Sequence, residues 1–168
     1  VLEICSTIGS ATIPFTYDFL EFSDCESALK KIVEQNGVLD LIVSNVGSGR
    51  FPIDYLNANI NSYIDCFNIN LFQCINLFNS SFDVLNPSGS QLMSISSIAG
   101  CEDIGAPIAY QSAKAALLTY MKSLSRHCAQ DNIRVNCISP GNVFIEGGLW
   151  DNKLKENERS VKNYIKEN

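Results

Sequence analysis

Residues 39–49 read LDLIVSNVGSG, a nearly continuous apolar run that passes into a loop with two glycines. An apolar run of this length, without regular alternation of polar residues, predicts a parallel strand that is buried on both faces. The polar and glycine residues that follow predict a loop at the carboxyl end of that strand. We therefore expect a parallel sheet whose ligands bind where its strands end.

Further strands and helices alternate on both sides of this run. Aromatic and β-branched residues between turn residues predict strands at 13–20, 91–96 and 133–138. Apolar residues spaced by three and four predict helices, and the first of them opens on a capping box from Ser23 to Glu26. The predicted helices cover residues 23–36, 60–85, 110–129 and the polar stretch 153–168. Four strands alternating with helices predict an α/β fold, part of a Rossmann-type doubly wound parallel sheet in three α/β/α layers.

The composition excludes several classes of protein. Hydrophobic residues make up 46% of the 168 residues, which predicts a packed core. The net charge of −6, with no basic run among aromatics, excludes a nucleic-acid partner. No run approaches the ~20 apolar residues of a membrane span, so we expect a soluble, cytoplasmic protein. The seven cysteines contain no C-x-x-C pair, and we expect reduced thiols and no metal site.

A tyrosine and a lysine at the start of a predicted helix form the clearest candidate site. Tyr110 and Lys114 are four residues apart, so both side chains lie on one helix face roughly 6 Å apart. A cation at this distance favours the phenolate form of a tyrosine, which suits a general acid or base. Ser97 lies thirteen residues upstream, at the end of a predicted strand, where its hydroxyl can reach the same crevice.

Each of these residues also has a simpler interpretation. Lys114 can cover an aromatic ring on an exposed helix face, and Ser97 can cap its own loop. Asn70, on the predicted helix 60–85, can be a solvated asparagine. His127 and Trp150 are the sole residues of their types, and solvation or packing explains them as well as catalysis does.

Order and spacing of the motifs resemble the short-chain dehydrogenase/reductase family over residues 10–150, and its 3-oxoacyl-carrier-protein reductase branch in particular. The run SNVG at 44–47 is similar to the family's N-N-A-G motif, and Ile69–Leu71 to the segment with its active-site asparagine. The matching positions continue with Ile95–Ser97 for the catalytic serine, Tyr110–Lys114 for Y-x-x-x-K, and Pro140–Gly141 for P-G. Glu21–Asp24 aligns with a D-x-x-D element and has Glu in its first position.

The resemblance implies an NAD- or NADP-dependent oxidoreductase that transfers a hydride between nicotinamide and the carbonyl or secondary alcohol of a small molecule. It implies the catalytic residues Ser97, Tyr110, Lys114 and Asn70. It implies the cofactor-binding residues Glu21, Phe22, Asn45, Gly47, Tyr110, Lys114, Pro140, Gly141 and Val143. A substrate lid is expected at 144–150, and the helices 60–85 and 110–129 are expected to form a homo-oligomer, a dimer or a tetramer.

One element of the family has no counterpart here, the glycine turn T-G-x-x-x-G-x-G. The sequence starts at Val1, its first methionine is Met93, and residues 1–12 resemble the end of a helix. We therefore expect residues 1–168 to form a single, incomplete NAD(P)-binding domain, in which the strand at 13–20 has no neighbour beside the one at 39–43. Such a chain is expected to bind a nicotinamide cofactor poorly and to aggregate.

Two other functions remain open at this point. One is a fragment without activity, or a non-enzymatic binding module. The other is a sugar-nucleotide epimerase, because these enzymes share the Y-x-x-x-K pair. The spacing of thirteen residues from Ser97 to Tyr110 favours the reductases over the epimerases.

Overall fold

The computed structural model describes residues 14–54, 56 and 58–167. In this part of the chain, three strands form a parallel sheet whose spatial order follows the sequence: β1 (Leu41–Ser44), β2 (Ser90–Ile95) and β3 (Ile133–Ile138). Gln91 pairs with Leu41 on one side and with Arg134 on the other. The predicted parallel sheet is confirmed, and β3 has the bounds that the sequence predicted.

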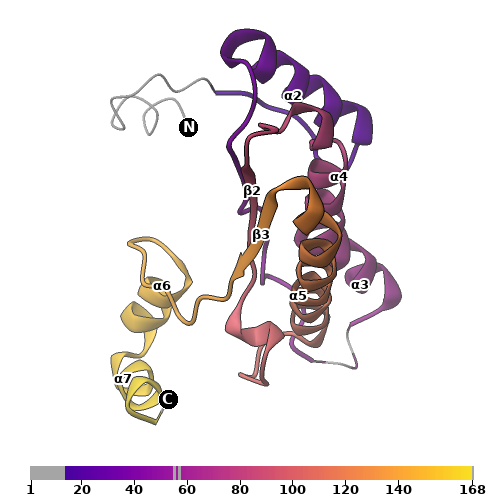
Figure 1. Ribbon diagram of the computed structural model, residues 1–168. Coiled ribbons are helices and arrows are strands. Elements are labelled where there is room, and N and C mark those ends of the chain that lie inside the picture. The colour runs from indigo at the N-terminus through magenta and orange to yellow at the C-terminus, as the bar shows by residue number, and fades with distance from the viewer. Residues whose placement is uncertain (1–13, 55, 57, 168) are drawn as a thin grey trace.

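Most of the described helices lie along one side of this sheet, as Figure 1 shows for α2, α4 and α5. The helices are α2 (Phe22–Asn36), α3 (Ile60–Phe67), α4 (Gln73–Asn79), α5 (Ile108–Cys128), α6 (Leu149–Glu156) and α7 (Glu158–Glu167). A π-helical turn, Asn68–Phe72, joins α3 to α4. Short 3₁₀ turns lie at Phe82–Val84, Ile98–Gly100 and Ala129–Asp131. No helix among the described residues is long and apolar enough to cross a membrane.

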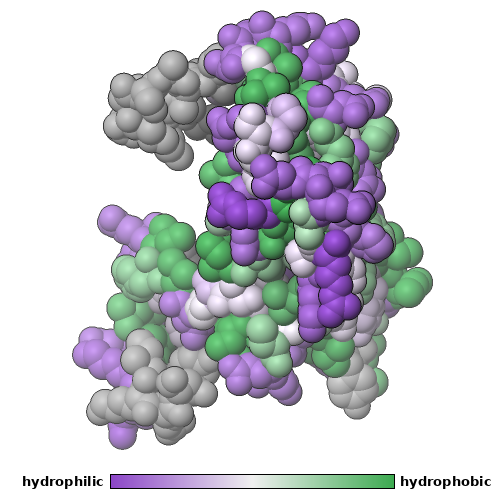
Figure 2. Space-filling view, in the orientation of Figure 1, coloured by the Kyte–Doolittle hydropathy of each residue, from purple (hydrophilic) through white to green (hydrophobic). Residues whose placement is uncertain are grey.

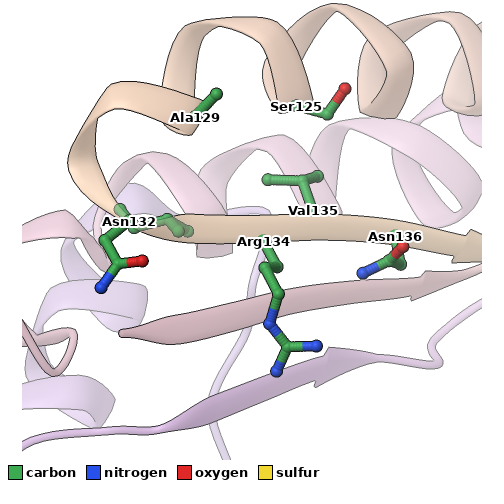
Figure 3. Close-up of a pocket in the computed structure, with 7 residues that line it drawn as sticks. Ser125, Ala129, Asn132, Arg134, Val135 and Asn136 are labelled. Atoms are coloured by element: carbon green, nitrogen blue, oxygen red, sulfur yellow. The ribbon is translucent and has the colours of Figure 1, made fainter. Parts of the chain in front are cut away.

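The core lies between the sheet and the helices α4 and α5. Ile42 and Leu92 point to this side and pack with Phe78, Leu117 and Met121, all of them buried. Figure 3 shows the alternation along β3, where Val135 points towards α5 and Arg134 points to the opposite face.

The opposite face of β1 corrects one prediction. Leu41 is 50% exposed and Val43 is 47% exposed, so the described part of the chain covers only one face of β1. The apolar run had predicted burial on both faces. Apolar side chains also gather on the loop before α6, where Val143, Phe144 and Ile145 are exposed (Figure 2).

The strand predicted at 13–20 is wrong for the residues that the structure describes. Residues 14–20 form an irregular segment and a turn, while Ile13 and the helix end expected at 1–12 lie outside the described residues. The Asn76 carboxamide on α4 donates to the carbonyl oxygens of Phe19 and Leu20, at 3.2 and 2.8 Å. Aromatic residues favour a strand only where a neighbouring strand can accept their backbone hydrogen bonds, and here a helix side chain binds this backbone instead.

The capping box is also wrong, although the helix that it announced is present. The residue that precedes α2 is Glu21, and its side chain caps no backbone N–H. The helix therefore already includes Ser23. The side chain that binds the segment before α2 is Asp24 instead of Glu26: its carboxylate accepts the backbone N–H of Asp18 at 3.0 Å.

The helix predicted at 60–85 is interrupted and ends early. The π turn at Asn68–Phe72 divides it, and α4 ends at Asn79. The hydroxyls of Ser80 and Ser81 donate to carbonyl oxygens of the last helical turn, which satisfies groups that a continuing helix would pair with backbone N–H. The polar stretch predicted as one helix at 153–168 is likewise two helices, α6 and α7, divided at Asn157.

Candidate active site

Loops at the carboxyl ends of all three strands meet at one end of the sheet. Ser96, just after β2, donates its backbone N–H to the Ile138 carbonyl at 2.7 Å, and Ile98 donates to the Pro140 carbonyl at 3.0 Å. Together with the start of α5 and parts of α6 and α7, these loops line a cleft of about 990 Å³. This is the position at which the sequence predicted ligand binding.

Tyr110, on the first turn of α5, lies at this cleft, and Lys114 follows one turn later on the same helix. The Nζ atom of Lys114 is 5.8 Å from the centre of the Tyr110 ring. Tyr110 is half-buried and lines the cleft, whereas Lys114 is only 4% exposed. Among the described residues, the Lys114 ammonium donates one hydrogen bond, to the Ile95 carbonyl oxygen at 3.0 Å, which leaves two of its three N–H groups without an acceptor there.

Burial lowers the pKa of Lys114 below its ordinary value, and the thiols of Cys137, Cys74 and Cys66 partly oppose this effect. Burial disfavours the charged form of an amine, so this lysine is held in the site at a cost to folding. Burial also raises the pKa of Cys66, and raises that of Cys74 to about 11, so both remain protonated thiols at neutral pH. Most of the described cysteines are buried, while Cys101 is exposed.

Ser97 lines the same cleft at the end of β2. Its Oγ accepts the backbone N–H of Ala99 at 3.2 Å, which leaves its hydroxyl hydrogen for an acceptor in the cleft. The structure therefore combines both interpretations of Ser97: the side chain caps its own loop and still faces the cleft.

Asn70 is fully buried, which excludes the solvated asparagine as an interpretation. Its Oδ1 accepts the Ser48 N–H at 3.1 Å, and its Nδ2 donates to the Ser48 and Cys66 carbonyl oxygens, each at 2.9 Å. Asn70 thus fixes the loop after β1 through its side chain. Gly47 lies directly above it: a Cβ on Gly47 would be 2.8 Å from Asn70 Oδ1 and 3.1 Å from Lys114 Nζ.

The other residues predicted to bind the cofactor divide into two groups. Gly141 and Val143 line the cleft, with Asn45 and Pro140 in the same strand-end loops. Glu21 and Phe22 lie at the start of α2 and do not line this cleft. Trp150 of the predicted lid lines the cleft and lies 4.7 Å from Lys153 Nζ, measured to its ring centre.

Four residues of the site were not assigned from the sequence: Ser48, Gly49, Ser96 and Gly100. A Cβ on Gly49 would lie 3.7 to 3.8 Å from the Tyr110 ring, so this glycine packs against the phenol. Ser96 donates its hydroxyl to the Lys114 carbonyl at 3.1 Å. The two glycines at 47 and 49 could have pointed to this loop from the sequence, whereas nothing in the sequence distinguished Ser96 from an ordinary serine beside Ser97.

A parallel sheet with flanking helices, with Ser97 after β2 and Tyr110 and Lys114 at the start of α5, defines a protein of the Rossmann-type α/β class. The family model for short chain dehydrogenase matches residues 1–151, and the chain belongs to this family. The family uses NAD or NADP, so the predicted cofactor class is confirmed.

Individual relatives agree with this assignment. The chain is 28% identical over 131 residues to the 3-oxoacyl-acyl-carrier-protein reductase FabG of Chlamydia muridarum, which covers 76% of the chain and 52% of FabG. The chain spans about half the length of the curated relatives that it matches.

Solved structures show the same fold. A Burkholderia xenovorans protein assigned to the short-chain dehydrogenases/reductases superposes with a TM-score of 0.83 at 22% identity, over 99% of this chain and 63% of that one. A short chain dehydrogenase from Leptospira borgpetersenii, solved with bound NAD+, gives a TM-score of 0.70 at 24% identity, over 78% of this chain and 54% of that one. The predicted Rossmann-type fold is thereby confirmed.

Proposed function

We propose that this chain carries the catalytic half of an NAD(P)-dependent oxidoreductase, which interconverts a carbonyl and a secondary alcohol on a small molecule. The observation that carries the proposal is that Ser97 and Tyr110 line one cleft, while the buried Lys114 lies behind Tyr110 with its Nζ 5.8 Å from the ring centre. A buried cation beside a phenol suits proton transfer, and in this family that chemistry accompanies hydride transfer.

The residues present fit a nicotinamide cofactor. Lys114 keeps two N–H groups for ribose hydroxyls after its bond to Ile95, and Gly47 leaves open the space that a side chain would fill above it. Gly141 and Val143 would lie along the cofactor as walls of the cleft, whose volume of about 990 Å³ suits a large ligand. When bound, the nicotinamide would supply or accept the hydride.

Three residues of this chain would handle the proton and the oxygen of the substrate. Ser97 donates its hydroxyl hydrogen to the substrate oxygen, because its own Oγ is already fixed by the Ala99 N–H. Tyr110 gives its phenolic proton to that oxygen during reduction and takes it back during oxidation. Lys114 stabilises the phenolate that remains, through the electrostatic effect of its ammonium on the ring.

Asn70 supports this arrangement without reaching the cleft. Its carboxamide binds both backbone groups of Ser48. This fixes the positions of the two neighbouring glycines, Gly47 next to Lys114 and Gly49 next to Tyr110. This supports a positioning role for Asn70 in the reaction.

The proposal is tested by mixing the purified chain with millimolar NADH or NADPH and a panel of ketones, and by following the absorbance of the reduced nicotinamide. We expect slow turnover that needs high cofactor concentration, because the glycine turn of the family has no counterpart in the sequence. Turnover that is the same with Tyr110→Phe, or no turnover with any ketone and either cofactor, would contradict the proposal.

We also propose that the chain assembles with itself through α3 and α5. Ile60 and Ile64 are one turn apart on α3 and are 71% and 49% exposed. Apolar side chains at such spacing form a stripe that a partner helix can cover. Light scattering should report a dimer or tetramer that Ile60→Lys combined with Ile64→Lys converts to monomer.

A further inference from the structure

Lys114 is held by its backbone as well as by its ammonium group. The Ser96 hydroxyl, 5% exposed, donates to the Lys114 carbonyl oxygen at 3.1 Å. An interior helix carbonyl normally accepts one N–H from the residue four positions on, so Ser96 uses its second lone pair. This bond joins the residue next to Ser97 to the helix turn that follows Tyr110.

Gly100 contacts the same peptide unit from the other end of the loop. A Cβ on Gly100 would lie 2.7 Å from the Lys114 carbonyl carbon and 2.9 Å from both the Lys114 oxygen and the Ala115 nitrogen. These atoms belong to a helix backbone and cannot move aside as a flexible side chain can. Position 100 therefore has to be glycine for the loop to approach α5 this closely.

We infer that Ser96 and Gly100 form a two-point brace on the Lys114 peptide, which sets the position of Lys114 and Tyr110 relative to Ser97. The Lys114 side chain adds a third contact between the same two segments, because its ammonium donates to the carbonyl oxygen of Ile95, the residue before Ser96. Ser96 and Gly100 are positioning residues, and the inference rests on the proposed function.

Ser96→Ala removes the hydroxyl, and Ser94→Ala is its matched control. Ser94 lies on the same face of β2 and is fully buried, but its hydroxyl donates to Cys137 Sγ at 3.2 Å. We expect Ser96→Ala to lower kcat about tenfold with little change in KM for the ketone, and Ser94→Ala to change neither. Ser96→Thr, which keeps the hydroxyl, should recover most of the loss.

The pH profile separates positioning from general loosening. In the direction of alcohol oxidation, a Lys114 that has moved away stabilises the Tyr110 phenolate less. The midpoint of the acid limb should therefore move to higher pH in Ser96→Ala, by about one unit, and stay in place in Ser94→Ala. Gly100→Ala should move the same limb in the same direction. The loss of kcat in the Ser96→Ala, Gly100→Ala double variant, expressed as activation free energy, should be smaller than the sum of the two single losses.

A second measurement does not depend on turnover. Lys114 is buried, so an acylating reagent should modify it slowly, and mass spectrometry should find its labelling about tenfold faster in Ser96→Ala than in Ser94→Ala. Equal labelling, or equal kcat and equal pH profiles in the two variants, would overturn the brace. An inactive wild type whose Lys114 labelling still responds to Ser96→Ala would refute the proposed function and leave the brace supported.

Discussion

The carboxamide of Asn70 binds both backbone groups of Ser48: Oδ1 accepts its N–H at 3.1 Å and Nδ2 donates to its carbonyl oxygen at 2.9 Å. One side chain thus supplies two hydrogen bonds that would otherwise require a neighbouring backbone segment. The loop that contains Gly47 and Gly49 is therefore held in a fixed position next to Lys114 and Tyr110.

Asn70→Ala should destabilise the fold and lower activity together. The substitution leaves two partly buried backbone groups without partners, which costs about 2 kcal/mol of the free energy of unfolding. Denaturant unfolding measures this cost. Asn76→Ala is the matched control, because Asn76 also donates from this helical segment to backbone carbonyls, but at Phe19 and Leu20, outside the cleft. Lower stability with unchanged activity in Asn76→Ala, and loss of both in Asn70→Ala, is the expected pattern.

Much of this site could be predicted from the sequence because its motifs are local. Tyr110 and Lys114 share a helix, so their spacing predicts their contact, and the strand β3 has the same bounds in sequence and structure. The π turn at Asn68–Phe72 could not be predicted, since one extra residue per turn barely alters an apolar spacing of three and four. That turn is what carries Asn70 into the core.

The failed predictions share another physical cause. The segment 14–20 has the aromatic residues of a strand, but strand formation depends on a neighbour that propensity does not contain. The bonds of Ser96 to Lys114 and of Asn70 to Ser48 join residues 18 and 22 positions apart, and such contacts exist only once the sheet has formed. Sequence spacing therefore predicted the contact between Tyr110 and Lys114, and missed the long-range hydrogen bonds of Ser96 and Asn70 around it.

Tyr110→Phe should abolish activity and leave stability unchanged. The phenol faces the cleft, so removal of its hydroxyl should lower kcat about 100-fold or more. The control is Tyr120→Phe on the same helix, whose buried hydroxyl has no hydrogen-bond partner among the residues that the structure describes. Removing an unsatisfied buried hydroxyl should raise the melting temperature slightly and leave kcat unchanged. A comparable loss of activity in both variants would argue against Tyr110 as the proton donor.

Gly47→Ala should be costly where Gly141→Ala is tolerated. A Cβ at position 47 would collide with Asn70 Oδ1 at 2.8 Å, whereas one at position 141 would meet no atom of the described residues within 4 Å. We expect Gly47→Ala to lose about 1 to 3 kcal/mol of the free energy of unfolding and to weaken NADH binding, and Gly141→Ala to stay within about 0.5 kcal/mol of wild type. Thermal unfolding of both variants, with a fluorescence titration of NADH, measures the difference.

Lys114→Met should change how stability depends on pH. Burial lowers the pKa of Lys114 in the folded chain below the ordinary value of 10.5, so between these two values the unfolded chain binds more protons than the folded one. Stability that is withheld by the buried charge at neutral pH is therefore recovered as the pH rises through the lowered pKa towards 10.5. The free energy of unfolding of wild type should rise relative to that of Lys114→Met over this window. Urea unfolding of the two proteins at a series of pH values measures the difference, and a constant difference would mean that the Lys114 ammonium carries no penalty for its burial.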